Sequence, residues 1–309
     1  MANNSWSKSQ IKARSHPNVM ALQIWLNAFY HGEQLDALLK TSLAYADRIR
    51  LRQPGPERWD AHPPHIDGGG IERWEDLGFR EVFKEIFAGD WKAHDPYDLS
   101  RRLQVNTNLY KRPGQSTIFR TFQGWLAMSD TKPNEGTLQV FPDIKLSNSY
   151  FILRPFFRPV EQPVSADPLD PQNWEFNTSN PDFPGIYPVG EYYLGPRPND
   201  KTHPHLRLSE TMTSVPHVKP GDMDLIHAVE FEHHGQNDSS VMYIPAVPAT
   251  PYNKEYIIKQ KEHFLIGKPP PDFPQNDGEI GFSNLGNEND IASDLGRIAM
   301  GLPVGEVAA

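Results

Sequence analysis

The histidines and carboxylates of this chain are its most informative candidates for chemistry. The sequence contains 12 histidines and no cysteine, so imidazole and carboxylate groups are the available metal ligands. His65 and Asp67 are separated by one residue, which places both side chains on one face if the segment is a strand. Such a pair can fill two adjacent positions of an octahedral ion. Gly68-Gly69-Gly70 follows directly and allows a sharp turn or a close backbone approach.

A third ligand has to come from a distant segment. His227 is the best candidate because it follows Leu225-Ile226 in a short apolar strand after a Pro-Gly turn. With His65 and Asp67 it would complete the 2-His-1-carboxylate triad that is typical of non-heme Fe(II) oxygenases. A histidine buried for structural reasons is the alternative interpretation of His227. The competing histidines are His233 and His234, which lie in a polar, turn-like stretch. His62 and His65 form an alternative pair of ligands, but Pro63-Pro64 between them disfavours a shared strand face.

Composition and charge exclude several classes of protein. The 309 residues carry a net charge of −9 and show no basic stripe, which argues against a nucleic-acid partner. No uncharged apolar run approaches the roughly 18 residues that cross a bilayer, and the N-terminus lacks the apolar segment of a signal peptide. The absence of cysteine is typical of an intracellular chain. We therefore expect a cytoplasmic protein that acts on a small molecule, with no membrane or nucleic-acid partner.

The pattern of prolines and apolar residues favours a mainly β fold with flanking helices (α+β). The 30 prolines disfavour long helices. Apolar residues at helical spacing predict a helix after Ser15-His16-Pro17-Asn18 that ends before Gly32, a second between Gly70 and Gly89, and a third over residues 254–266. We expect these stripes to face the core: Leu22, Trp25, Leu26 and Phe29, then Phe79, Val82, Phe83, Ile86 and Phe87. Strands are predicted over residues 116–129, 136–142, 150–157 and 239–247.

No internal boundary divides the chain, so a single domain is predicted for residues 1–309. Its helical part covers residues 1–60, its barrel residues 61–250, and its C-terminal helix and tail residues 251–309. Ten prolines fall between Pro155 and Pro198. They predict a long ordered loop that packs over the barrel and covers a binding site.

Several segments match one family in the same order along the chain. They are Trp6–Gln10, Ser15–Asn18, Pro64–Gly69, Glu72–Trp74, Phe119–Trp125, Gly136–Pro142, Leu153–Pro155, Ile226-His227, Met242–Pro245, Gly296-Arg297 and Ala299–Leu302. On these segments the chain resembles the DUF1479 family, a branch of the Fe(II)/2-oxoglutarate-dependent oxygenases. The resemblance implies a double-stranded β-helix, related to jelly rolls and cupins, with a long Pro-rich insertion.

The resemblance also implies a mechanism and a class of substrate. Iron would be held by His65, Asp67 and His227, with 2-oxoglutarate as co-substrate and O2 as oxidant. The expected reaction is oxidation of an unactivated C–H bond. Some fungal proteins of this type act on small amino acids in specialised metabolism, including an oxygenase that closes valine-like substrates to aziridines. The expected substrate is therefore small, polar and amino-acid-like.

The chain departs from the wider superfamily in how it could anchor 2-oxoglutarate. Most of these oxygenases use an arginine that follows the third metal ligand, but this chain has none between Arg207 and Arg297. A dianion in a partly dry pocket needs a cationic partner, and a guanidinium suits a carboxylate best. Arg120 and Arg154 lie in apolar, strand-like contexts and are the predicted anchors, assisted by Ser240. An internal ion pair is the alternative role for each arginine.

Two further expectations concern the strand and the length of the chain. Alternation along the strand predicts that Gln123 and Trp125 face away from the site if Arg120 lines it, with Trp125 in the core. Family members have a longer stretch before the third ligand and begin further upstream. Two interpretations of the short stretch are therefore open: the strand is truncated, or residues are missing between Met223 and Asp224. The upstream start of the family members is compatible with a segment missing before residue 1.

Two other functions remain compatible with the residues. A cupin-like module that binds a metal or small ligand without 2-oxoglutarate turnover would explain the missing late arginine. A zinc hydrolase is the weaker alternative, because zinc sites seldom leave three adjacent positions open.

Overall fold

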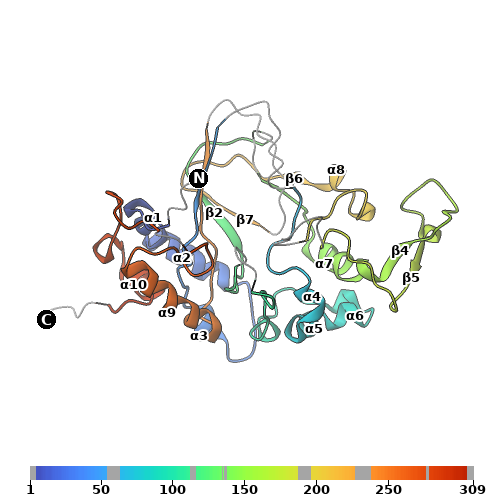
Figure 1. The fold of residues 1–309 in the computed structure, drawn as a ribbon, viewed down its shortest axis with the longest axis horizontal. Coiled ribbons are helices and arrows are strands. Elements are labelled where there is room, and N and C mark those ends of the chain that lie inside the picture. Colours follow the sequence, from blue (N-terminus) through green and yellow to red (C-terminus); the bar gives the residue numbers. More distant parts are fainter. Residues whose placement is uncertain are drawn as a thin grey trace.

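Two groups of helices flank a central antiparallel sheet (Figure 1). The computed structural model describes residues 5–53, 63–111, 116–133, 135, 138–186, 196–226, 238–275 and 278–304, with the backbone alone for residues 224–226. Within these residues the architecture is mixed α/β with antiparallel sheets and flanking helices, and it is less dominated by strands than the expected mainly β fold. The described strands form one four-stranded sheet and two two-stranded pairs, which do not establish the expected double-stranded β-helix. No described helix is long and apolar enough to cross a membrane.

The central sheet has the strand order β1-β8-β2-β7. These strands are β1 (Ile49–Arg52), β2 (Gln123–Ala127), β7 (Met223–Ile226) and β8 (Ser239–Tyr243). The register pairs Trp125 with Tyr243 on one side of β2, and Gln123 with Ile226 on the other. Trp125 is buried, as predicted, and packs with Leu138. The first residue of β2 and the last residue of β7 therefore lie side by side.

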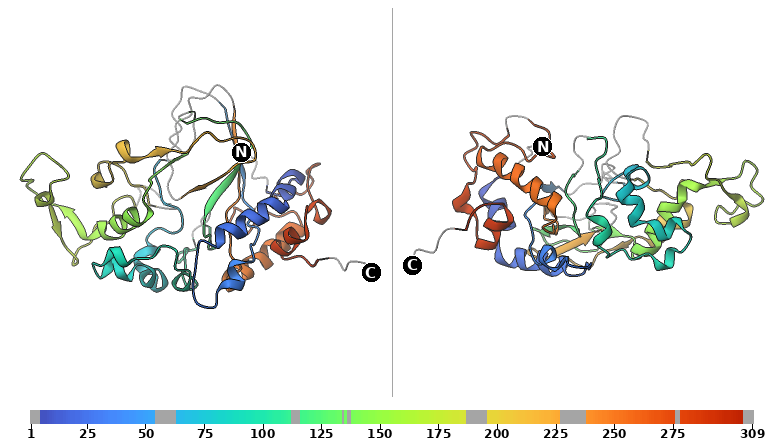
Figure 2. Two further views of the ribbon diagram at one scale, coloured as in Figure 1. Left: turned by 180° about the vertical axis from the view of Figure 1, so that it is seen from behind. Right: turned by 90° about the horizontal axis from the view of Figure 1, so that it is seen from below.

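Helices from the two ends of the chain pack together on one side of the sheet (Figures 1 and 2). They are α1 (Lys8–Arg14), α2 (Pro17–Asn27), α3 (Asp36–Leu39), α9 (Pro251–Leu265) and α10 (Asp294–Ala299). Trp6 and Met20 share a buried cluster with Phe264 and Met300. The predicted start of α2 is confirmed, because His16 caps the helix and Pro17 occupies its first turn. The predicted C-terminal helix corresponds to α9.

A second group of helices lies on the other side of the sheet. It contains α4 (Glu72–Glu75), α5 (Leu77–Val82), α6 (Lys84–Phe87), α7 (Ile144–Leu153) and the short helix α8 (Leu208–Thr211). The predicted apolar stripe after Gly70 is buried here, although three short helices replace the expected single one. Phe79 and Phe83 pack with Phe151 and Ile152 of α7 in one cluster. This cluster fixes α4, and therefore the loop before it, against α7.

The end of the Pro-rich segment lies beside the loop at His65, where the Pro196 carbonyl accepts the Ile66 N–H, but its first part does not form the predicted cover. Its strands β4 (Phe157–Pro159) and β5 (Trp174–Phe176) pair as a hairpin that projects beyond α7, away from the central sheet (Figure 1). Residues 187–195 of the segment lie outside the described part of the chain. A further short pair joins β3 (Gln139–Val140) to β6 (Thr213–Ser214).

One predicted strand is a helix, one predicted helical stripe is misplaced, and the other predicted strands are shorter than expected. Residues 150–156 continue α7 and a 3-10 turn, because the Asp143 side chain caps that helix by accepting from the Leu146 N–H. In α2 the predicted stripe is misplaced: Leu26 is buried, but Trp25 and Phe29 are 57% and 50% exposed. The strand expected over residues 116–129 shortens to β2.

A buried histidine gives the fold a pH-dependent stability. His94 is fully buried against Phe83, and neither ring nitrogen has a hydrogen-bond partner among the described residues. Burial, reinforced by the charge of Arg102, lowers the pKa of His94 to about 4. The unfolded chain therefore takes up this proton at a higher pH than the folded chain does.

We predict that the free energy of unfolding decreases as the pH falls from about 6.5, the ordinary histidine value, toward the folded-state pKa. His94→Leu should flatten part of this slope, because leucine cannot take up a proton. Chemical denaturation at a series of pH values measures the effect. His203, whose pKa burial lowers to about 3, contributes with the same sign and remains in the variant. An unchanged slope in His94→Leu would contradict the assignment.

Candidate active site

His65 and Asp67 face each other across the loop that precedes α4. The loop has no strand pairing, contrary to prediction, but it is tied to a distant segment by the Ile66 N–H, which donates to the Pro196 carbonyl at 3.0 Å. His65 Nε2 lies 3.5 Å from Asp67 Oδ1. The sequence prediction that these two side chains converge is therefore compatible with the structure, although a turn and not a strand brings them together.

The hydrogen bond on the other ring nitrogen sets the tautomer of His65. Its Nδ1 lies 2.8 Å from the Pro63 carbonyl oxygen, and a carbonyl can only accept, so Nδ1 carries the hydrogen. In the neutral ring the Nε2 lone pair then faces the Asp67 carboxylate. A backbone carbonyl on the far nitrogen is the usual support of a metal-binding histidine.

These two side chains fit a shared cation. Metal ligands of this type lie about 2.0–2.2 Å from the ion, so two of them on one ion are separated by at most about 4.4 Å. The observed 3.5 Å is within that limit. No group of three histidine, aspartate or glutamate side chains occurs among the described residues, and His227, the predicted third ligand, lies outside them. The described end of β7, directly before His227, pairs with Gln123.

The conformation of the loop after Asp67 depends on two glycines and on Arg73. Gly68 and Gly69 have φ values of +86° and +93°, a region that side chains other than glycine rarely adopt. Arg73 Nη2 then donates to the Asp67 carbonyl at 2.9 Å. The Glu72 carboxylate accepts the Gly70 N–H at 2.8 Å. Side chains of α4 thus fix the backbone at Asp67 and, with it, the position of the Asp67 carboxylate.

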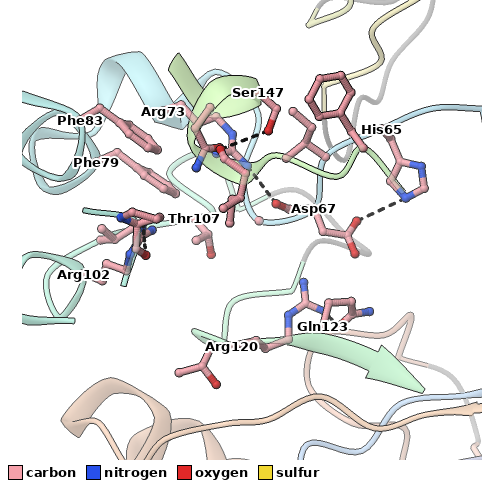
Figure 3. Close-up of a pocket in the computed structure, with 18 of the residues that line it drawn as sticks. His65, Asp67, Arg73, Phe79, Phe83, Arg102, Thr107, Arg120, Gln123 and Ser147 are labelled. Atoms are coloured by element: carbon pink, nitrogen blue, oxygen red, sulfur yellow. Dashed lines mark hydrogen bonds and ion pairs between the residues drawn. The ribbon is translucent and has the colours of Figure 1, made fainter. Parts of the chain in front are cut away.

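A pocket of about 150 Å³ lies beside His65 and Asp67 (Figure 3). Its polar lining is provided by three arginines, Asp67 and a small set of neutral groups, whereas its apolar lining comes largely from the helices near α5 and from the segment before β2. The charged lining residues are Asp67, Arg73, Arg102 and Arg120, and the apolar ones include Phe79, Phe83, Val105 and Ile118.

Arg120 and Gln123 lie across the pocket from His65 and Asp67 (Figure 3). Arg120 Nη1 donates to Gln123 Oε1 at 2.6 Å, and no described carboxylate forms an ion pair with Arg120. The prediction that Arg120 and Gln123 face opposite ways was wrong. Regular alternation begins only at Gln123, where β2 starts, so the preceding residues follow no strand period.

The other two predicted anchors do not line this pocket. Arg154 lies in the 3-10 turn after α7, where its Nε and Nη1 donate to the carbonyls of Thr202 and Phe157 at 2.9 and 2.6 Å. Ser240 lies within β8, and its N–H donates to Ser129 Oγ at 2.9 Å. Arg154 therefore stabilises the backbone after α7 through these hydrogen bonds.

Two pocket residues were not predicted from the sequence. Arg73 comes from α4, and Arg102 from the 3-10 turn Ser100–Arg102. Arg73 is flanked by Glu72, Trp74 and Glu75, a charged run typical of an exposed helix, so its sequence neighbours give no signal of a buried arginine. Arg102 follows another arginine, a pattern typical of an exposed surface, so its sequence gives no such signal.

Comparisons with known proteins agree on a family. The Gig2-like family model matches residues 2–302. A crystal structure of GlcNAc Inducible Gene 2, GIG2 (DUF1479), from Candida albicans has a TM-score of 0.83 and 37% identity, covering 97% of this chain and 65% of that one. The chain belongs to the Gig2-like family, which confirms the expected DUF1479 membership.

Two bacterial relatives extend this comparison. The uncharacterized protein YbiU of Escherichia coli K12 is 31% identical in an alignment of 308 positions that covers 97% of this chain and 66% of that protein. A crystal structure named "Putative Oxidoreductase from Salmonella typhimurium LT2" has a TM-score of 0.79 and 29% identity, and covers 98% of this chain and 68% of that one. The chain thus spans 65% to 68% of the length of these three relatives.

The two glycines after Asp67 allow a matched test of the loop. A Cβ on Gly69 would lie 3.2 Å from the Phe79 ring, whereas a Cβ on Gly68 would meet nothing within 4 Å. Gly68→Ala should cost about 1–2 kcal/mol of stability, the ordinary cost of a left-handed residue. Gly69→Ala should cost more, because Phe79 must also move. Chemical denaturation of both variants measures the difference, and equal losses would contradict the described packing.

Proposed function

We propose that this protein is a non-heme Fe(II)/2-oxoglutarate-dependent dioxygenase with a double-stranded β-helix core. It oxidises an unactivated C–H bond of a small, polar, amino-acid-like substrate. The observation that carries the proposal is the facing pair His65 and Asp67, with the His65 tautomer set by Pro63, at the edge of a pocket lined by arginines. The name of the Salmonella relative supports an oxidative role, and the resemblance to 2-oxoglutarate oxygenases supports the co-substrate.

In this proposal His65 and Asp67 hold the iron, and His227 supplies the third ligand. The iron, when bound together with 2-oxoglutarate and O2, supplies the oxidising power for the C–H bond. The protein contributes binding and orientation. The Pro63 carbonyl accepts from Nδ1 and orients the His65 ring, and Arg73 holds the Asp67 backbone in place.

Arg120 is the proposed anchor of the distal carboxylate of 2-oxoglutarate. It is the predicted anchor that lines the pocket, and it lies on the wall opposite His65 and Asp67 (Figure 3). The Gln123 side chain accepts one of its N–H groups at 2.6 Å and thereby orients the guanidinium. The remaining N–H donors suit a carboxylate, which a planar guanidinium binds in a bidentate manner.

We predict that the purified protein releases succinate from 2-oxoglutarate when Fe(II) is present, and that amino acids added one at a time stimulate the release. His65→Ala and Asp67→Ala should each abolish it, since loss of a ligand exceeds the roughly 10–100-fold effect of losing a ligand's supporting partner. His31→Ala is the matched control, because His31 forms a surface pair with Asp95 at 2.9 Å.

Two results would contradict this assignment. Near-normal turnover in either ligand variant would place the metal elsewhere. Stoichiometric iron binding without any succinate release would favour the cupin-like binding module.

A second prediction concerns the two arginines that the sequence left open. Arg120→Gln should raise the KM for 2-oxoglutarate by about thirtyfold, which corresponds to about 2 kcal/mol of lost charge-assisted binding. Arg154→Gln should change it less than about threefold, because Arg154 donates to backbone carbonyls outside the pocket. Steady-state kinetics on variants with unchanged melting temperatures measure both effects. The reverse ranking would reject Arg120 as the anchor.

A further inference from the structure

A second cationic feature of the pocket is not used by the proposed function. Arg73 and Arg102 line the same pocket as His65 and Asp67 and are drawn together in Figure 3. The Arg73 side chain is deeply buried, with 6% of the residue exposed. Charge of one sign on a buried wall is costly unless a counter-charge is present.

The hydrogen bonds of these two arginines do not supply that counter-charge. Arg73 Nη2 donates to the Asp67 carbonyl, and Arg102 Nη2 donates to the Pro96 carbonyl at 3.1 Å. Both acceptors are neutral. The Nε of each guanidinium is buried without a hydrogen-bond partner, and neither arginine forms an ion pair with a described carboxylate. Each of these two pocket-lining arginines thus has a buried donor without an acceptor among the described residues.

Arg73 lies close enough to Arg102, and to the carboxylates of Asp67 and Glu72, to interact electrostatically with all three. Neither carboxylate is in ion-pair contact with Arg73, because the Glu72 carboxylate accepts the Gly70 N–H and the Asp67 carboxylate lies 3.5 Å from His65 Nε2. The two guanidinium groups repel each other, and an anion beside both would relieve that repulsion.

The charges of the pocket leave room for more than one anion. Among its described lining residues are three arginines and a single carboxylate, that of Asp67. In the proposed function a divalent iron adds two further positive charges. Asp67 and one 2-oxoglutarate dianion together carry fewer negative charges than the iron and the three arginines carry positive ones. The substrate is the remaining component, and the apolar side chains of Phe79, Phe83 and Val105 line the pocket together with these arginines.

We propose that Arg73 and Arg102 form a carboxylate-binding subsite for the substrate, separate from the 2-oxoglutarate anchor at Arg120. The substrate class is a small carboxylic acid whose apolar carbons contact the phenylalanine side of the pocket. The identity of this acid as a substrate rests on the proposed function, whereas its binding to the arginine pair does not. A carboxylic acid is favoured over inorganic phosphate because the lining is partly apolar and suits the hydrocarbon part of the acid.

Ligand-induced thermal stabilisation tests the subsite without turnover. The probes are butyrate, its neutral counterpart butyramide, and inorganic phosphate, each titrated into the metal-free full chain at constant ionic strength. The dependence of the melting temperature on probe concentration gives a Kd for each. Butyrate should stabilise the protein more than butyramide or phosphate does.

The variants separate the arginine pair from general charge effects. Arg102→Gln should weaken butyrate binding about tenfold or more, as expected for one charge-assisted hydrogen bond. Arg101→Gln is the matched control. Arg101 is its neighbour in the same turn but does not line the pocket, and it pairs with Glu85 at 2.6 Å. Arg73→Lys keeps the charge at the buried position and should weaken butyrate binding through loss of the planar donor group.

A parallel titration of 2-oxoglutarate with Mn(II), a redox-inactive metal, distinguishes the two anion sites. Arg102→Gln should leave the Kd of 2-oxoglutarate within about threefold. The proposal is overturned if Arg102→Gln leaves butyrate binding unchanged, if butyramide or phosphate binds as well as butyrate, or if 2-oxoglutarate loses as much affinity as butyrate. Absence of succinate release in the turnover assay would reject the proposed function and leave the butyrate result to decide on the subsite.

Discussion

The hydrogen bond from Arg73 to the carbonyl of Asp67 connects the two parts of the candidate site. It fixes the backbone that carries the Asp67 carboxylate, and it directs a buried guanidinium toward the same pocket. The position of Arg73 depends in turn on α4, which packs through Trp74 with α5, α6 and α7. Any shift of this helical group would therefore change both the His65–Asp67 pair and the cationic wall.

The central sheet provides the opposite wall of the pocket. Arg120 and Gln123 stand at the beginning of β2, next to the described end of β7. The sheet and the helical group are far apart in sequence, since the loop at His65 precedes β2 by more than fifty residues. The candidate site is thus a long-range arrangement, in which a glycine turn from one segment meets a strand end from another.

Local signals in the sequence predicted part of this structure. They failed where packing between distant segments determines the conformation. The cap at His16 with Pro17, the buried stripe of Phe79 and Phe83, and the turn at Gly68 and Gly69 are local features, and they are present. Residues 150–157 are rich in aromatic side chains and were predicted to be a strand, but the Asp143 cap starts a helix at Ile144 that continues to Leu153. A search for capping residues before this segment would have corrected the prediction.

The site was predicted with the same mixture of success and failure. His65 and Asp67 could be paired from their spacing, and Arg120 from its apolar context. Arg73 and Arg102 could not be assigned, because their convergence depends on the packing of α4 against the turn at Arg102. Arg154 has an equally apolar context in the sequence, but its guanidinium donates hydrogen bonds to backbone carbonyls. Apolar context alone therefore does not separate a ligand-binding arginine from a structural one.

The most direct test of the account is a crystal structure of the protein grown anaerobically with Fe(II) and 2-oxoglutarate, with anomalous scattering recorded at the iron edge. The account predicts one iron bound by His65 Nε2 and an Asp67 carboxylate oxygen, and a 2-oxoglutarate whose distal carboxylate contacts Arg120. An anomalous peak away from His65 and Asp67, or no peak at all in crystals that hold the co-substrate, would contradict it.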